Sequence, residues 1–203
     1  MFKIAVLISG GGSNLLSIIE NIEKENIEAK IHCVISDRQS AKGILKAKEK
    51  GIDTFVISKK EYGNNTSEKI LELLKGKVDL VVLAGYLSIL DGEILKEFKN
   101  KIINIHPSLI PSFSGPGMYG IKVHEAAIKK GVKFSGCTVH LVNEEVDGGA
   151  IIEQALVPVF FEDTAKTLQE RILVEEHKIL PEVIKAFSLN KVEIENGRAR
   201  ILL

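Results

Sequence analysis

Short apolar runs alternate with segments of helical spacing through the first hundred residues, and this alternation limits the folds open to the chain. The strand-like runs cover residues 3–9, 29–36, 53–57, 78–84 and 102–106. The segments that separate them repeat apolar residues at helical spacing, at 14–23, 40–50, 66–74 and 91–99. Repeated strand–helix units form a parallel sheet with right-handed crossovers and helices on both faces. The alternation therefore predicts an α/β, Rossmann-like fold with a mostly parallel sheet.

The second half of the chain has a different rhythm. A loop rich in Gly and Pro spans 107–120, a length at which loops are usually functional. The elements expected after it are a helix at 122–130, strands at 133–142 and 150–159, a helix at 164–188 and a hairpin at 191–202. Pro181 should kink or break the long helix, and Asn196-Gly197 is a strong hairpin turn. We expect antiparallel strands added to the parallel sheet of one 203-residue domain.

The charge balance and the cysteine content limit the kinds of binding partner and the cellular compartment that we expect. Lys+Arg and Asp+Glu both number 27, so a general attraction to nucleic acid or to an anionic membrane is not expected. No apolar run approaches the ~20 residues of a membrane span, and the N-terminus is typical of a first strand rather than a signal peptide. Cys33 and Cys137 lie in strand patterns as small hydrophobes. A cytoplasmic protein without a metal site is the expectation.

A glycine loop, Ser9-Gly10-Gly11-Gly12-Ser13-Asn14, joins the first strand to the first helix. Glycines allow close approach of a ligand, and N–H groups at a helix N-terminus attract phosphate. No Lys follows, so this is not an ATPase loop, and Leu15 stands where a dinucleotide fingerprint has its third glycine. The position of Asp37 fits the acid that binds ribose in dinucleotide sites, but we interpret Asp37 as an ordinary turn residue. Three glycines exceed what a helix cap requires, so we predict phosphate binding at the loop.

Asn104 and His106 lie two residues apart at the end of the fifth apolar run, and Pro107 ends it. Side chains two apart in a strand share a face, so an amide donor and a titratable ring point the same way. Open α/β sheets build their sites at the carboxyl ends of strands. Asp147, in the turn Val146-Asp147-Gly148-Gly149, would favour an imidazolium if it lay near His106. The pattern predicts an enzyme with acyl-type chemistry.

Taken together, these motifs resemble the glycinamide ribonucleotide formyltransferases, a family of folate-dependent enzymes of purine synthesis. The similarity extends in order over nearly the whole chain. The segments that carry it are 8–15 (ISGGGSNL), 82–87 (VLAGYL), 104–109 (NIHPSL), 136–140 (GCTVH), 146–149 (VDGG) and 175–178 (EEHK).

The resemblance implies transfer of a formyl group from the cosubstrate 10-formyltetrahydrofolate to the amine of phosphoribosylglycinamide. It implies a catalytic set of Asn104, His106 and Asp147, with Asn104 and His106 as an oxyanion site. Substrate binding is expected from Gly12, Ser13, Asn14, Pro107 and Glu176. Folate binding is expected from Leu87, Ser88, Ile89, Leu90, Asn104, Val142, Glu144 and Glu145. It also implies a phosphate-binding Rossmann-like half at 1–100, a folate and catalytic half at 101–203, and a monomer or homodimer.

The chain departs from the family pattern at two places. Ser88 stands where many relatives carry Arg or Lys, and the region around Asn65 has no basic residue. His32 and His140 are expected to be packed or edge residues of their strands, whereas His124 opens a helix near the expected site.

Other functions remain open. A methionyl-tRNA or amino-sugar formyltransferase and a formyltetrahydrofolate hydrolase share this chemistry, but the tRNA enzyme usually carries a further C-terminal domain and the hydrolase an extra N-terminal one. A nucleotide-sensing Rossmann-like module would use the glycine loop alone, and it gives no reason for Asn104 and His106 on one strand face.

Overall fold

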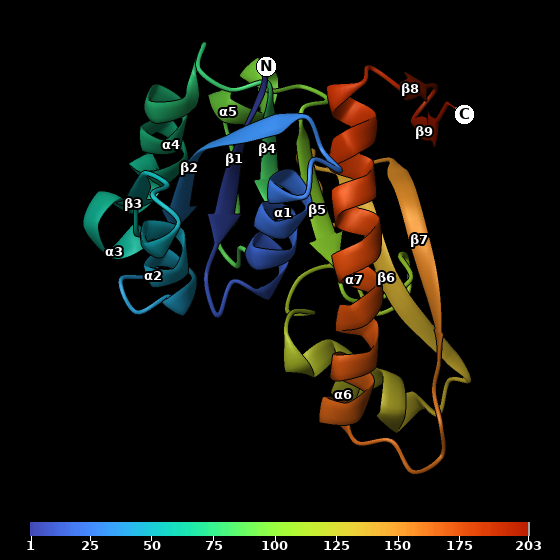
Figure 1. The fold of residues 1–203 in the computed structure, drawn as a ribbon. Coiled ribbons are helices and arrows are strands. Elements are labelled where there is room, and N and C mark those ends of the chain that lie inside the picture. Colours follow the sequence, from blue (N-terminus) through green and yellow to red (C-terminus); the bar gives the residue numbers. More distant parts are fainter. Residues whose placement is uncertain (203) are drawn as a thin grey trace.

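A seven-stranded sheet forms the centre of the computed structural model, which describes residues 1–202 (Figure 1). Its strands are β1 (Phe2–Ile8), β2 (Ala29–Ser36), β3 (Thr54–Val56), β4 (Leu80–Leu83), β5 (Ile102–His106), β6 (Phe134–Leu141) and β7 (Ile151–Pro158). They lie side by side in the order β3-β2-β1-β4-β5-β6-β7. The first five run parallel, whereas β6 pairs antiparallel with β5, and β7 pairs antiparallel with β6 at the edge of the sheet. The predicted fold class is confirmed.

Helices cover both faces of the sheet. They are α1 (Ser13–Glu23), α2 (Lys42–Glu49), α3 (Lys59–Tyr62), α4 (Thr66–Leu74), α5 (Glu93–Glu97), α6 (Ile121–Lys130) and α7 (Ala165–Ser188), with a 3₁₀ turn η1 (Gly63–Asn65). Apolar residues of α1, α2 and α7 pack on one face, and those of α4 and α5 pack on the other (Figure 1). Strands buried on both faces explain the continuous apolar runs in the sequence.

The C-terminal hairpin consists of β8 (Val192–Glu195) and β9 (Arg198–Ile201). Asn196 and Gly197 both have positive φ, as a two-residue hairpin turn requires. The sequence prediction of this hairpin is confirmed. Its apolar side chains Ile194, Ala199 and Ile201 pack against the core, and β9 lies next to β7.

Helix α7 runs unbroken from Ala165 to Ser188, with Pro181 inside it. The expectation of a break at this proline is wrong. A proline cannot donate to the carbonyl four residues before it, which here belongs to His177. The hydroxyl of Ser17 on α1 donates to that carbonyl at 2.8 Å. The helix continues because a neighbouring helix supplies the missing donor.

Candidate active site

The glycine loop places the first turn of α1 at the carboxyl edge of the sheet. Gly12 precedes the helix with φ 70°, and no side chain caps the helix. A Cβ at Gly12 would lie 2.8 Å from the Cα of Gly43, so the start of α2 approaches the loop too closely for any side chain. The uncapped N–H groups and the positive end of the helix dipole suit an anion.

Two of the predicted substrate residues meet behind this loop. The side-chain nitrogen Nδ2 of Asn14 donates to Oε2 of Glu176 on α7 at 2.7 Å, and both side chains are buried. Burial raises the pKa of the Glu176 carboxyl, and the hydrogen bond from Asn14 opposes this effect. The packing of α1 on α7 therefore puts a carboxyl group beside the predicted phosphate site.

Asn104 and His106 lie on β5, and the antiparallel register sets His140 of β6 opposite Asn104. Nδ2 of Asn104 lies 3.0 Å from Nε2 of His140, and Nδ1 of His140 lies 2.8 Å from the Leu141 carbonyl. A carbonyl only accepts, so Nδ1 carries the proton and Nε2 of the neutral ring accepts from Asn104. Burial lowers the pKa of His140, which favours this neutral form. The second N–H of the Asn104 amide is left for a ligand.

His106 is 4% exposed and has a different environment on each side of its ring. Its Nε2 lies 2.9 Å from the Phe113 carbonyl and therefore carries a proton. Its Nδ1 lies 3.6 Å from Oδ2 of Asp147, which is longer than a hydrogen bond. Nδ1 is thus the ring nitrogen that can exchange a proton with a ligand.

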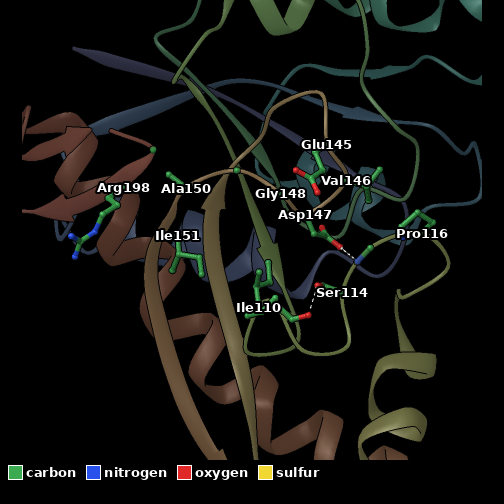
Figure 2. Close-up of a pocket in the computed structure, with 15 residues that line it drawn as sticks. Ile110, Ser114, Pro116, Glu145, Val146, Asp147, Gly148, Ala150, Ile151 and Arg198 are labelled. Carbon is green, nitrogen blue, oxygen red and sulfur yellow. Dashed lines mark hydrogen bonds between the residues drawn. The ribbon is translucent and has the colours of Figure 1, made fainter. Parts of the chain in front are cut away.

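The carboxylate of Asp147 lies between two imidazoles. Oδ1 is 3.6 Å from Nε2 of His140, and Oδ2 is 3.6 Å from Nδ1 of His106. Asp147 has φ 58° in the turn after β6, and Oδ2 accepts a hydrogen bond from the N–H of Gly115 at 2.8 Å. Figure 2 shows this bond to the loop that carries Ser114 and Pro116. The fold brings the three predicted catalytic side chains together, and Pro107 follows them where β5 ends.

The predicted folate-binding residues occupy two segments. Leu87 and Ile89 are exposed, whereas Leu90 is buried in the core cluster on which Val142 also packs. Glu144 and Glu145 are exposed on the turn after β6. The hydroxyl of Ser88 donates to Oδ2 of Asp37 at 2.7 Å. Asp37 therefore does not present both carboxylate oxygens to a ribose.

A cavity of about 950 Å³ lies beside Asp147. The loop at 110–116, the turn at 145–151 and the hairpin at 197–199 line it, with Ile110, Ile151 and Arg198 among its walls (Figure 2). Asp147 and Glu145 are the predicted site residues that line it. The other predicted residues lie outside its walls.

The sequence interpretation missed His140 as a member of the site. The residue is packed, as expected, but its ring also holds the Asn104 amide. The register of β5 against β6 is the signal that identifies it, because it pairs residue 104 with residue 140. The backbone groups of Phe113 and Gly115 were also missed, since main-chain contacts leave no residue type to recognise. His124 is 1% exposed, and its Nδ1 has no partner within residues 1–202.

Within the part of the chain that the structure describes, no cluster of three His, Cys, Asp or Glu residues is placed to hold a metal ion. Among the same residues, no helix combines the length and the apolar character that crossing a membrane would require.

Comparisons with known proteins agree on one family. The formyl transferase family model matches residues 2–184. The chain is 43% identical to a phosphoribosylglycinamide formyltransferase of Haemophilus influenzae, over 98% of this chain and 93% of the relative. A solved glycinamide ribonucleotide transformylase 1 of Symbiobacterium toebii superposes with a TM-score of 0.94 and 42% identity, covering 100% of this chain and 95% of the other.

A formyltetrahydrofolate deformylase of Pseudomonas syringae also superposes, with a TM-score of 0.90 and 25% identity, over 100% of this chain and 66% of the deformylase. Its identity to this chain is lower than that of the two transferases. The chain therefore belongs to the formyl transferase family, among the phosphoribosylglycinamide formyltransferases.

Proposed function

We propose that this protein transfers the formyl group of 10-formyltetrahydrofolate to the amine of N1-(5-phosphoribosyl)glycinamide, a step of purine biosynthesis. The family supports the reaction class. The observation that carries the proposal is the free amide N–H of Asn104 beside His106 and Asp147. A donor and an acid–base pair within one site are what acyl transfer between nitrogens needs.

In the proposed reaction the neutral amine attacks the formyl carbon. A new C–N bond forms, and the carbonyl π electrons become an oxyanion. The free N–H of Asn104 and the protonated Nδ1 of His106 donate to this oxygen. The intermediate then collapses by breaking the bond from the formyl carbon to N10 of the folate.

One proton must leave the attacking nitrogen, and one must reach N10. His106 and Asp147 carry these protons in our proposal, because Nδ1 and Oδ2 face each other at 3.6 Å. The hydrogen bond from Nε2 of His106 to the Phe113 carbonyl keeps the ring oriented during the transfer. No net proton is gained or lost over the reaction.

Substrate binding follows from the same arrangement. The phosphate would bind the N–H groups after Gly12, at Ser13 and Asn14, and Glu176 would bind the ribose hydroxyls. The folate would lie between residues 87–90 and the turn at 142–147, with its formyl group at Asn104. We further propose one formyltransferase domain over 1–203, a cytoplasmic location and a monomer or homodimer as the functional unit.

The test is formyl transfer from 10-formyltetrahydrofolate, followed by the absorbance of the folate product with and without phosphoribosylglycinamide. Turnover that requires the acceptor supports the transferase. Turnover that is equal without the acceptor would identify a hydrolase, the second candidate that the deformylase likeness favours. A folded protein that turns over neither way would overturn both activities.

A further inference from the structure

The loop after β5 is attached to β6 and β7 through a cluster of hydrogen bonds in which every position of the Thr138 hydroxyl is used. The hydroxyl of Thr138 on β6 is fully buried and donates to the Ser108 carbonyl at 2.6 Å. The same oxygen accepts from the N–H of Ile110 at 3.1 Å and from Nε2 of Gln154 on β7 at 2.9 Å. A hydroxyl has one donor and two acceptor positions, and all three are used.

Gln154 completes this cluster with its second N–H. Nε2 of Gln154 also lies 3.2 Å from the Ile110 carbonyl. Both neighbours of the amide nitrogen can only accept, because the single hydrogen of Thr138 already points at Ser108. The position therefore requires a donor, and a carboxylate of the same shape would face two acceptors.

The loop that Gln154 anchors touches two of the three predicted catalytic groups through its backbone. Three residues beyond Ile110, the Phe113 carbonyl accepts from Nε2 of His106 at 2.9 Å. Two residues further, the N–H of Gly115 donates to Oδ2 of Asp147 at 2.8 Å. The cluster at Ile110 thus sets the position of the segment that orients both the imidazole and the carboxylate.

We propose that Gln154 is a positioning residue of the formyl transfer, acting through the loop at 108–115 on His106 and Asp147. The expected effect on catalysis rests on the proposed function, whereas the anchoring of the loop by Gln154 does not. Gln154 is exposed on the edge strand β7, and its side chain makes no hydrogen bond to a predicted catalytic side chain. Replacing Gln154 should slow the chemical step and leave substrate affinity nearly unchanged, since small misplacements of reacting groups lower the reaction rate strongly.

The experiment compares Gln154→Met, which keeps the length without donors, and Gln154→Glu, which keeps the shape without donors at neutral pH. For both variants we expect kcat to fall about tenfold or more, with KM for either substrate within about twofold. Hydrogen exchange of the Gly115 amide should quicken, because the loop that carries this N–H is no longer anchored and its hydrogen bond to Asp147 opens more often. In a Thr138→Val background, Gln154→Met should change the Gly115 exchange rate little further, since both changes break one cluster.

Leu156→Ala is the matched control, because Leu156 is exposed on the same strand two residues away. It should leave kcat and Gly115 exchange at the wild-type values. A Gln154→Glu variant with wild-type kcat and wild-type exchange would overturn the inference, and so would a lower kcat with unchanged exchange. If the wild type transfers no formyl group, the proposed function fails, whereas the exchange measurement still decides whether Gln154 anchors the loop.

Discussion

The amide of Asn104 is held by the neutral imidazole of His140 on the next strand, with 3.0 Å between Nδ2 and Nε2. The Leu141 carbonyl fixes the tautomer of that imidazole, and burial keeps the ring uncharged. If the amide group could rotate by 180°, either its oxygen or its nitrogen would face a ligand. The contact with His140 selects the nitrogen, so one N–H of Asn104 faces the site as a donor.

Replacing Asn104 with Ala should therefore lower turnover by roughly 10²–10³-fold, the usual loss for one oxyanion donor. The fold should persist, because the side chain is only half-buried. Steady-state formyl transfer and thermal unfolding measure the two effects. Asn64→Ala, at an exposed asparagine of η1, should behave as wild type. Near-normal turnover of the Asn104 variant would remove the residue from this role.

Gly12→Ala should cost about 1–3 kcal/mol of unfolding free energy, because a non-glycine residue is strained at φ 70° and its Cβ would press on the Cα of Gly43. It should also raise KM for the phosphorylated acceptor, since the loop must shift. Gly11→Ala is the matched control for stability, as a Cβ there has no atom within 4 Å. Chemical denaturation of both variants provides the comparison. Equal stabilities would show that the loop relaxes around the added methyl group.

The sequence predicted the sheet well because buried parallel strands are recorded locally, as continuous apolar runs. The fifth run, 102–106, coincides with β5 (Ile102–His106). The short elements α3 and η1, between Lys59 and Asn65, were not predicted, because four and three residues hold too little of a periodic pattern. The break expected at Pro181 was wrong, because the donor that replaces the missing N–H comes from α1, far away in the sequence.

The site was predictable in its residue types but not in its contacts. Asn104 and His106 share a strand face, which alternation alone gives. The approach of Asp147 to His106, and of His140 to Asn104, depends on strand register and on the turn after β6. The partner of Ser88 was also hidden, since Asp37 lies 51 residues earlier. Long-range pairing of this kind leaves no local periodicity to read.

The stability of the protein should decline between pH 6.5 and pH 4 because of His124. Burial, followed by the nearby His106, lowers the pKa of His124 from 6.5 to about 4. As the pH falls through this window the unfolded chain binds the proton first, so the unfolding free energy drops, by up to about 3 kcal/mol. His140 and His177 act in the same direction, while the raised pKa of Glu176 opposes them.

His124→Leu isolates this contribution, because it removes the titration and keeps an apolar side chain in a buried position. The unfolding free energy of wild type and variant, measured by urea denaturation from pH 7 to pH 4.5, should differ by an amount that changes with pH. The unfolding free energy of the variant should rise relative to that of the wild type as the solution becomes more acidic. Parallel curves would mean that His124 is not held neutral in the folded state.

Ser17 and Pro181 should be coupled in stability although they make no hydrogen bond to each other. Ser17→Ala leaves the partly buried His177 carbonyl without its donor, which should cost about 1–3 kcal/mol. Pro181→Ala restores a backbone N–H that can bond the same carbonyl. The cost of Ser17→Ala should therefore be smaller in the Pro181→Ala background than in the wild type. A double-mutant cycle of unfolding free energies measures this coupling, and strictly additive values would show that the hydroxyl of Ser17 does not replace the donor that the proline lacks.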